Sequence, residues 1–357
     1  MKTEYSIEYV SRDDFSTLQN DWEKLERGED MTYFQTFSWY RMLLEKDTTK
    51  DTKNHEVVFV KVADNTGALL ICPLFIIKFP FRLVNRPGIF IYGSWGWTDY
   101  CNFIYDKLDQ KAFVETLYQV SRKYNVIRWN FRSIKESTKL YSFVSNKYEL
   151  FDEKTETCVH LIMPKNQEEY HKSLSKHSRQ NLRTAMNRLH RDNINYTINH
   201  CDCLLNLNEF QKFRIDRLTQ KVKPYKSSLL TSIKISIWKL LKYSFPDYIP
   251  FESDKNCKYL SIKDSKGDLL AAFCYGYDLI HNEAVIMAAC VNETYRFYSP
   301  GMVAMYDFIV SNLGLNMFKI DFTRGAEPYK YALGGEEHFI HHFSIKVIDC
   351  NNVSSSN

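Results

Sequence analysis

A strand–turn–strand pattern occurs twice in this chain, about 200 residues apart. The apolar runs of "HEVVFVKVADNTGALLICPLFII" flank the turn "DNTG", and "KYLSIKDSKGDLLAAFCYGY" repeats the arrangement around "DSKG". Such turns predict β-hairpins with glycine at the left-handed position. The matching residues are Asp64, Gly67, Leu69 and Leu70 in the first half, and Asp264, Gly267, Leu269 and Leu270 in the second. Turns converge on Asp and Gly for local reasons, so the matching letters alone are weak support for a duplication.

The order of elements after each hairpin strengthens the case for a duplication. In both halves further strand, a helix and another strand follow, and the last strand reads "VIRWNF" in the first half and "MFKIDF" in the second. Alternating strands and helices are typical of the α/β class. We therefore predict an α/β protein in which one unit is repeated.

Length and composition limit the classes of protein that need to be considered. A chain of 357 residues is long enough for about two domains. Its 44% apolar and 25% charged residues are ordinary for a soluble globular protein. The net charge of +4 is too small to imply DNA or membrane binding by itself.

No targeting, membrane or metal signature stands out in the sequence. No signal peptide follows Met1, and the longest apolar runs are about half the length that crosses a bilayer. The nine cysteines are irregularly spaced and form no CxxC pair, which fits a reducing cytoplasm. We therefore expect a cytoplasmic protein with no membrane span and no metal. The clusters "HCDC" and "HFIHH" lack the paired spacing of a zinc site.

A basic segment lies between the two halves. The stretch "NQEEYHKSLSKHSRQNLRTAMNRLHRDN" has apolar residues at helical spacing, which predicts one amphipathic helix over residues 166–192. Residues 165–191 contain seven Lys or Arg and only two acidic residues, so the chain's net positive charge is concentrated here. A solvated helix face is one interpretation. The other is an anion site, in which Lys176, Arg179 and Arg183 bind the ligand and the arginines grip phosphate bidentately.

A second candidate site lies at the start of a C-terminal helix. The strand "AVIMAACV" leads through "NETYRFYSPG" into the helix "MVAMYDFIVSNL". Ser299 suits the N-cap and Pro300 the first helical position, while Gly301 leaves room for close backbone approach. Free N–H groups and the helix dipole favour a phosphate there, and Arg296 adds positive charge. A capped helix without a ligand is the alternative, since the glycine spacing matches neither a dinucleotide fingerprint nor a P-loop.

The stretch "DFTRGAEPYK" follows the apolar run "LNMFKI" and ends a predicted buried strand. It gathers Arg324, Gly325, Tyr329 and Lys330 within seven residues. Gly325 allows the chain to turn away from the strand. For Arg324 two roles are open, an ion pair that closes the strand end and a contact with a ligand.

Three motifs in this order resemble the CelD/BioF2-like acetyltransferase group of the GNAT superfamily. They are "KSLSKHSRQNLRTAMNRLHRD", "YRFYSPGMVAMYDFIVSNLG" and "DFTRGAEPYK", with further similarity at "WTDYCNF" and "FQTFSWY". The resemblance implies two tandem GNAT-like units, each a mixed, mostly antiparallel sheet flanked by helices. It implies an N-terminal domain over residues 1–157 and a catalytic domain over residues 158–357, entered through the basic helix at 166–192.

The resemblance also implies transfer of an acetyl or other acyl group from acyl-CoA to an amine or hydroxyl. The expected acceptor is a sugar, a nucleotide sugar or another polysaccharide precursor of the cell envelope. The superfamily's usual diphosphate loop is not reproduced, so the identity of the donor stays open. The residues expected to hold the donor are Arg296, Tyr298, Ser299, Gly301 and Met302.

Catalytic roles follow from the same resemblance. We expect Tyr329 to act as the acid and Lys330 to stabilise the negative tetrahedral intermediate. Asp99, in a loop whose Trp97 could contact the acceptor, is the candidate for orienting or deprotonating that acceptor. A plain turn residue is the other interpretation of Asp99, and Glu327 could be the base instead.

Two other functions compete with this one. A Fem-type aminoacyltransferase would take its donor from aminoacyl-tRNA, and a tRNA surface needs more basic area than one helix provides. A non-catalytic binding protein could also keep the same fold.

Overall fold

The computed structural model describes residues 5–47, 51–79, 86–94, 98–201, 210, 212–213 and 256–348. The chain divides into two compact units, one of Met1–Cys158 with Glu337–Asn357 and one of Val159–Glu336. We predicted that everything from residue 158 onward belongs to the second unit, but the last strand belongs to the first. The reason is that β12 (Glu336–Lys346) pairs antiparallel with β5 (Arg128–Lys135).

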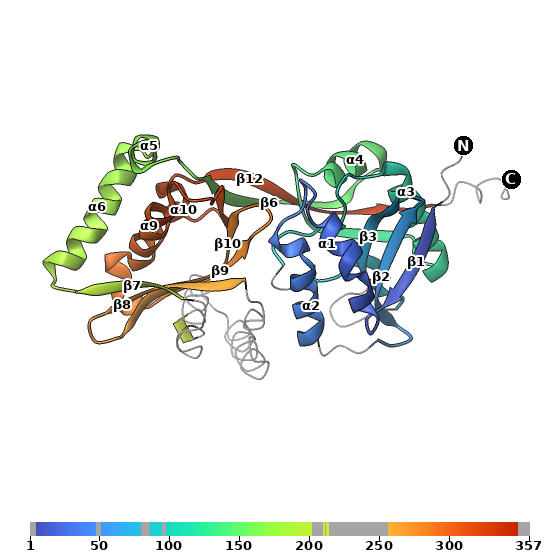
Figure 1. Cartoon of the computed structure of the whole chain (residues 1–357), viewed down its shortest axis with the longest axis horizontal. Helices are drawn as coiled ribbons and strands as arrows, with labels where there is room; N and C mark the ends of the chain where they lie inside the picture. Colours follow the sequence, from blue (N-terminus) through green and yellow to red (C-terminus); the bar gives the residue numbers. More distant parts are fainter. Residues whose placement is uncertain are drawn as a thin grey trace, which may run out of the picture. The chain divides into compact units, whose positions relative to one another are not determined.

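The strands of the first unit follow the order β1-β2-β3-β4-β5-β12. Figure 1 shows β1, β2 and β3 side by side at the start of this series. Neighbours pair antiparallel except β4 and β5, which are parallel. The remaining strands are β1 (Ser6–Ser11), β2 (His55–Asp64), β3 (Gly67–Ile77) and β4 (Gly88–Ile91). The helices are η1 (Phe15–Leu18), α1 (Gln19–Leu25), η2 (Tyr33–Gln35), α2 (Phe37–Lys46), α3 (Gln110–Tyr124) and α4 (Lys139–Lys147).

The strands of the second unit follow the order β7-β8-β9-β10-β11, continued by β6, whose residues up to Cys158 belong to the first unit and whose last residues, from Val159, belong to the second. Among the pairs β7–β8, β8–β9, β9–β10 and β10–β11, only β10–β11 is parallel. The strands are β6 (Phe151–Ile162), β7 (Tyr196–Cys201), β8 (Cys257–Asp264), β9 (Leu269–Asp278), β10 (Glu283–Val291) and β11 (Lys319–Arg324). The helices are α5 (Gln167–Ser173), α6 (Lys176–Arg191), η4 (Glu293–Tyr298), α9 (Pro300–Asn312) and α10 (Pro328–Ala332).

The two predicted hairpins, β2–β3 and β8–β9, share their detailed turn geometry. Asp64 and Asp264 each accept a hydrogen bond from the backbone N–H two residues later, at 2.7 Å and 2.9 Å. Gly67 and Gly267 have positive φ angles of 131° and 89°, as predicted. The strand register shifts at corresponding positions, between Val62 and Ala63 and between Ile262 and Lys263. This correspondence is more specific than a shared turn sequence.

The same topology continues beyond the hairpins. In the first unit β3 pairs antiparallel with β4, and α3 then crosses to the parallel strand β5. In the second unit β9, β10, α9 and β11 repeat this path. The predicted fold class, an α/β architecture of two tandem units with mixed, mostly antiparallel sheets, is confirmed.

The basic segment forms two helices where we predicted one. Residue Ser175 is extended, and its Oγ accepts the N–H of Ser178 at 3.0 Å, which caps α6 and separates it from α5. Helix α6 buries Leu182, Ala185 and Leu189 in the core of the second unit, together with apolar residues of α9 and the sheet. The apolar face of α6 therefore agrees with the predicted periodicity.

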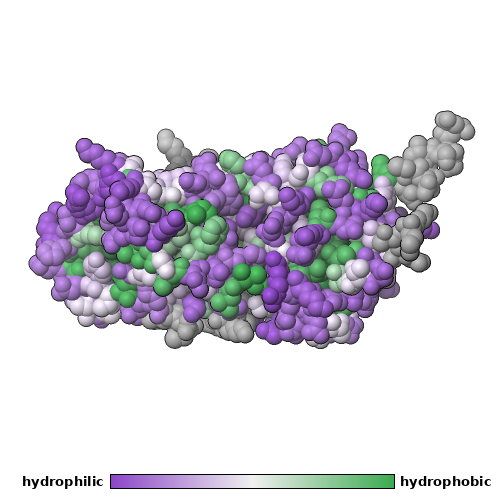
Figure 2. Space-filling view, turned by 45° about the horizontal axis from the view of Figure 1, so that its top comes forward, coloured by the Kyte–Doolittle hydropathy of each residue, from purple (hydrophilic) through white to green (hydrophobic). Residues whose placement is uncertain are grey.

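Figure 2 shows a mainly hydrophilic face with hydrophobic residues in separate small patches. Among the described residues, no helix combines the length and apolarity needed to cross a bilayer. Within the same ranges no cluster of His, Cys, Asp or Glu could hold a metal ion, while Cys203 of the "HCDC" cluster lies outside them.

Candidate functional site

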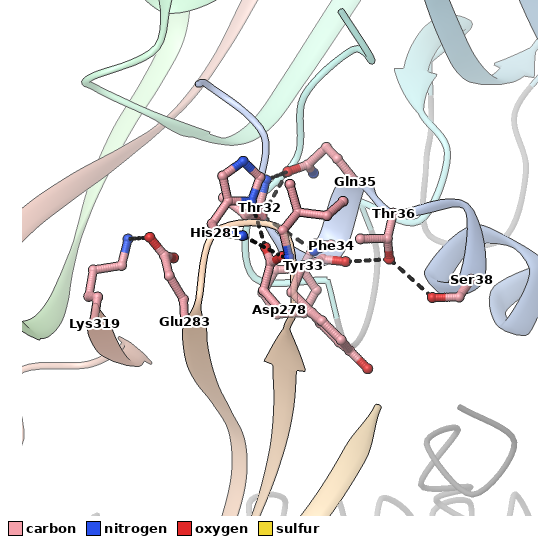
Figure 3. A network of polar contacts seen from close by, with 11 residues as sticks. Thr32, Tyr33, Phe34, Gln35, Thr36, Ser38, Asp278, His281, Glu283 and Lys319 are labelled. Carbon is pink, nitrogen blue, oxygen red and sulfur yellow. Dashed lines mark hydrogen bonds and ion pairs between the residues drawn. The ribbon is translucent and has the colours of Figure 1, made fainter. Parts of the chain in front are cut away.

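Strands β10 and β11 pair at one end and separate at the other. Their register covers only Glu283 to Val285 on β10, opposite Lys319 to Asp321 on β11. At the paired end the Glu283 carboxylate and the Lys319 ammonium form an ion pair at 2.6 Å (Figure 3). Both side chains are largely buried, so the contact is shielded from solvent and reinforces this end of the pair.

Thr323 marks the place where β11 leaves its neighbour. Its φ of 55° is unusual for a β-branched residue, and its N–H donates to the Asp321 carboxylate at 2.8 Å. Its Oγ1 donates to the carbonyl oxygen of Ile286 at 2.9 Å, so a side chain takes the place of a backbone ladder bond. Strand β10 also changes register against β9 just beyond Ile286. These two irregularities occur together at the point of separation.

A cavity of about 540 Å³ lies in this part of the second unit, which we call the α9 cavity. Its size falls within the usual range of small-molecule sites. It has apolar walls from β9, β10 and α9, with a few polar side chains from η4 and the segment leading into α10. The lining residues are Phe273, Ala289, Val291, Glu293, Arg296, Ser299, Pro300, Gly301, Met302, Glu327, Pro328 and Tyr329.

Ser299 and Pro300 occupy the N-cap and first helical positions of α9, as predicted. The conformation of Ser299 differs from that of an ordinary cap. Its φ of 49° and ψ of 47° are left-handed, and its side chain makes no capping hydrogen bond. Left-handed backbone in a non-glycine residue stores strain and is often found at functional sites. The Ser299 hydroxyl can therefore bind a ligand in the α9 cavity, which Ser299 lines.

The backbone donors at this turn are fewer than we predicted. The N–H of Ser299 donates to Arg296, and those of Met302 and Val303 donate to the carbonyl of Ser299. Pro300 has no N–H. Among the described residues the Gly301 N–H makes no hydrogen bond, so one donor remains at the start of α9 instead of several. A Cβ at Gly301 would lie 3.3 Å from the ring of Phe273, so a side chain at this position would crowd the wall of the cavity.

Lys330 does not line the α9 cavity. It is only 2% exposed, and its Nζ donates to the carbonyl oxygens of Thr323, Arg324 and Gly325 at 3.3, 2.7 and 2.8 Å. The same atom lies 3.0 Å from the Glu327 carboxylate. We expected the ammonium to face the reacting carbon, but these contacts occupy its donors. The geometry favours a structural role, because a buried ammonium is stabilised by hydrogen bonds and a counter-charge.

Glu327 and Tyr329 are the polar residues beside Lys330 that reach the cavity. Gly325 has a φ of 100°, and a Cβ there would lie 2.6 Å from Oε2 of Glu327. Glycine therefore lets the chain turn, as predicted, and also leaves space for the Glu327 carboxylate. Tyr329 packs edge-on to Phe322, with ring centroids 6.5 Å apart. This part of "DFTRGAEPYK" thus presents one carboxylate and one phenol to the cavity.

The predicted anion-binding cations Lys176, Arg179 and Arg183 all lie on α6, and none of them lines the α9 cavity. Arg179 donates to the carbonyl oxygens of His171 and Leu174 at 2.8 and 2.6 Å, so its guanidinium satisfies the end of α5. Lys176 and Arg183 are exposed and do not line the α9 cavity. Both carbonyl contacts of Arg179 come from Nη1, so its Nε and Nη2 donors are not used by them.

Arg188 is a contact residue that sequence reasoning did not single out. Its guanidinium lies over the ring of Phe297, 4.3 Å from the centroid, and donates to the Phe297 carbonyl at 3.0 Å. Tyr298 donates to the Asp192 carboxylate at 3.0 Å, and this bond raises the pKa of the phenol. Tyr298 does not line the α9 cavity; it links the end of α6 to η4 instead.

Of the remaining predicted residues, none that the structure describes is a lining residue of the α9 cavity. Asp99 is half-buried and belongs to the first unit, and its role stays a prediction. Trp97 lies outside the described residues. Arg324 is half-buried at the end of β11, where Lys330 binds its carbonyl. The cavity walls formed by Phe273, Ala289 and Val291 were missed, because strand periodicity alone does not tell a core residue from a cavity wall.

Comparisons with known proteins define the class of fold. No family model and no curated protein matches the chain, so the predicted CelD/BioF2-like membership has no support from a family match. The crystal structure of FemX matches with a TM-score of 0.59 at 9% identity, over 96% of this chain and 97% of that one. The C-terminal domain (DUF2156) of a putative lysylphosphatidylglycerol synthetase from Agrobacterium fabrum matches with a TM-score of 0.51 at 12% identity, over 95% and 93%.

A tandem GNAT protein from the clavulanic acid biosynthesis pathway also matches, with a TM-score of 0.49 at 9% identity over 97% of this chain and all of that one. At such low identities the likeness concerns the fold. The chain has the tandem α/β fold that it shares with FemX.

Proposed function

We propose that this protein is an acyltransferase that moves an acyl group from acyl-CoA to an amine or hydroxyl, with the donor bound in the α9 cavity. The observation that carries this proposal is the separation of β10 and β11 beyond Val285, with Tyr329 beside the resulting cavity. A thioester bound in the α9 cavity would lie along the edge of β10. Beyond Val285 this edge is not paired with β11 within the described residues.

The donor fits the lining of the α9 cavity. The apolar walls at Phe273, Ala289 and Val291 suit the pantetheine arm and the acyl chain. The open N–H of Gly301 and the guanidinium of Arg296 suit the diphosphate. A main-chain N–H on the edge of β10 would stabilise the oxyanion, an effect worth about 3 kcal/mol per donor in other enzymes.

The proton transfers are assigned to the two polar residues of the α10 segment. Glu327 takes the proton of the acceptor as its nitrogen or oxygen attacks the thioester carbon. The carbon–sulfur bond then breaks, and the Tyr329 hydroxyl protonates the leaving thiolate. Lys330 holds the Glu327 carboxylate at 3.0 Å and acts as a positioning residue. Asp99 stays the alternative base.

We propose a sugar or nucleotide sugar, a precursor of envelope polysaccharide, as the acceptor. The exposed cations Lys176 and Arg183 would contact the phosphate of a nucleotide sugar. Acyl-CoA as donor places the reaction in the cytoplasm.

Incubation of the protein with acetyl-CoA and a mixture of amino sugars tests the proposal. We expect release of free thiol, an acetylated product by mass spectrometry, and thermal stabilisation by acetyl-CoA, since ligand at 100 times its Kd adds about 2.7 kcal/mol. Tyr329→Phe should lower kcat by about 100-fold or more, while Tyr118→Phe on α3 should not. The absence of both thiol release and stabilisation at millimolar acetyl-CoA would overturn the donor assignment.

Aminoacyl-tRNA is the second candidate donor, and the fold shared with FemX favours it. Competition between acetyl-CoA and an aminoacyl-tRNA mixture separates the two. Binding to tRNA would weaken steeply with salt because it depends on phosphate contacts. A protein that binds a donor without turnover would instead be a non-catalytic member of the fold.

A further inference from the structure

A second cavity, of about 480 Å³, lies between the α5–α6 junction and α10; we call it the α6 cavity. Its polar lining comes from hydroxyl, amide and imidazole groups, and the described residues that line it include no Lys, Arg, Asp or Glu. The residues that matter here are Ser173, Ser175, His177, Asn181, Pro328 and Tyr331.

Helix α10 is a shared wall of the two cavities. Pro328 lines both of them, Tyr329 lines the α9 cavity, and Tyr331 and Ala332 line the α6 cavity. The two cavities therefore adjoin at Pro328. A ligand in the α6 cavity would reach Pro328, which precedes the proposed acid Tyr329 in the chain.

The wall between the cavities is firmly held. Lys330, in the middle of α10, donates to the carbonyls of Arg324 and Gly325 at the end of β11. Beyond α10 the backbone of Gly335 packs so closely that a Cβ would lie 2.5 Å from Val159 and 2.8 Å from the Lys330 carbonyl. These contacts hold α10, the wall of the α6 cavity, in a fixed position, and a fixed wall is required to position a reactant.

Two polar side chains of the α6 cavity are available to a ligand. Asn181 is half-buried and His177 is exposed, and within the described residues neither makes a hydrogen bond. Ser173 and Ser175 donate to the Tyr170 carbonyl and to Ser178, so each hydroxyl oxygen can still accept. Asn181 can donate and accept at once, which suits a hydroxyl group.

We propose that the α6 cavity binds the acceptor of the transfer, through a neutral polyhydroxyl ring of monosaccharide size. The absence of charged side chains from its lining disfavours a phosphate or carboxylate inside it, whereas hydroxyls match the amide and imidazole groups. The ring packs on Tyr331 and presents its amine or hydroxyl at Pro328, toward the donor. This assignment rests on the proposed function, which places the donor in the α9 cavity.

Saturation-transfer NMR with glucosamine tests the site, in the absence of any donor and at a pH above the pKa of the sugar's amine, where the ring is neutral. We expect the wild-type protein to bind at about 10 mM sugar, a concentration that nearly saturates a site with a Kd of about 1 mM. Asn181→Leu and His177→Leu should each weaken binding about fivefold, as loss of one hydrogen bond implies. Asn187→Leu, on the exposed face of α6, is the matched control and should bind normally.

Acetyl-CoA affinity measured on the same samples separates the two proposals. Unchanged acetyl-CoA binding in Asn181→Leu, with weakened glucosamine binding, supports the α6 cavity as the acceptor site. Glucosamine binding that is absent from the wild type, or equal in Asn181→Leu, overturns it. The protein could also fail to bind acetyl-CoA while its glucosamine binding still depends on Asn181. This result would support the sugar site and overturn only the donor assignment.

Discussion

The Nζ atom of Lys330 lies 2.7 Å from the carbonyl oxygen of Arg324, on the strand that precedes α10. Two more carbonyls and the Glu327 carboxylate complete the surroundings of this buried ammonium. A lysine that looks available for catalysis in the sequence thus fastens the end of β11 to α10. Its effect on the site is exerted through the position of its neighbours Glu327 and Tyr329.

Replacement of Lys330 should destabilise the second unit. Lys330→Met keeps most of the side-chain length but leaves three carbonyls and a carboxylate without their ammonium. Breaking a buried charge pair from one side costs about 3–5 kcal/mol, and we expect a loss toward the lower end because Glu327 is partly exposed. Urea unfolding followed by circular dichroism measures the change.

The control for this variant is Lys172→Met. Lys172 forms an exposed ion pair with Glu168 at 2.7 Å along α5, and such pairs contribute about 0.3–0.5 kcal/mol. Equal stability losses in the two variants would contradict the structural role of Lys330.

Relief of backbone strain at Ser299 should raise stability while weakening donor binding. Glycine adopts the left-handed conformation freely, so Ser299→Gly should stabilise the fold by up to about 1 kcal/mol. The loss of the hydroxyl from the α9 cavity should raise the Kd for acetyl-CoA severalfold. Calorimetry of the variant with and without acetyl-CoA measures both effects.

Asn193 offers a matched comparison for Ser299. It has a similar φ of 54° but does not line the α9 cavity. Asn193→Gly should leave acetyl-CoA affinity unchanged and give a smaller gain in stability, because asparagine tolerates this conformation better than serine. A weaker affinity in both variants would show that the effect of Ser299 is indirect.

A side chain at position 301 should obstruct the α9 cavity. A Cβ at Gly301 would lie 3.3 Å from Phe273 and 3.6 Å from Val291, so Gly301→Val must push these walls or fill the cavity. We expect an increase in the KM for the acyl donor of about tenfold or more, which corresponds to about 1.4 kcal/mol. Met302→Leu conserves volume at the next position and should change KM little. Steady-state thiol release gives both values.

One histidine of the first unit should make stability depend on pH. Burial lowers the pKa of His341 below 6.5, against the opposing effect of Glu136 and Glu153. The unfolded chain therefore takes up a proton at a higher pH than the folded protein does. The free energy of unfolding should fall as the pH drops from 6.5 through the pKa of the folded state.

Replacement of this histidine isolates its contribution. His341→Phe keeps an aromatic ring against Tyr141, whose ring centroid lies 4.2 Å away, and should flatten the stability profile over that pH range. Urea unfolding at several pH values between about 7 and about 5 measures the slope. His190→Phe, at an exposed position of α6, is the control for replacing a histidine by phenylalanine. A wild-type slope in His341→Phe would show that another group causes the pH dependence.

The sequence by itself determined the repeated architecture. Turn geometry at Asp64 and Gly67, and again at Asp264 and Gly267, depends on residues within a few positions of one another, so local patterns suffice to predict it. The start of α9 at Pro300 was predictable for the same reason. Local chemistry also identified the stretch from Arg324 to Lys330 as unusual.

The tertiary structure alone decided what these residues do. Whether a side chain can bind a ligand depends on its partners in the fold, and sequence spacing does not reveal these partners. Arg179 donates to the Leu174 carbonyl after α5, and Lys330 donates to the Arg324 carbonyl at the end of β11. The pairing of β12 with β5 joins segments about 200 residues apart, and no periodicity reports such a contact. The α9 and α6 cavities likewise arise from packing between elements, because a cavity is defined by the walls that surround it.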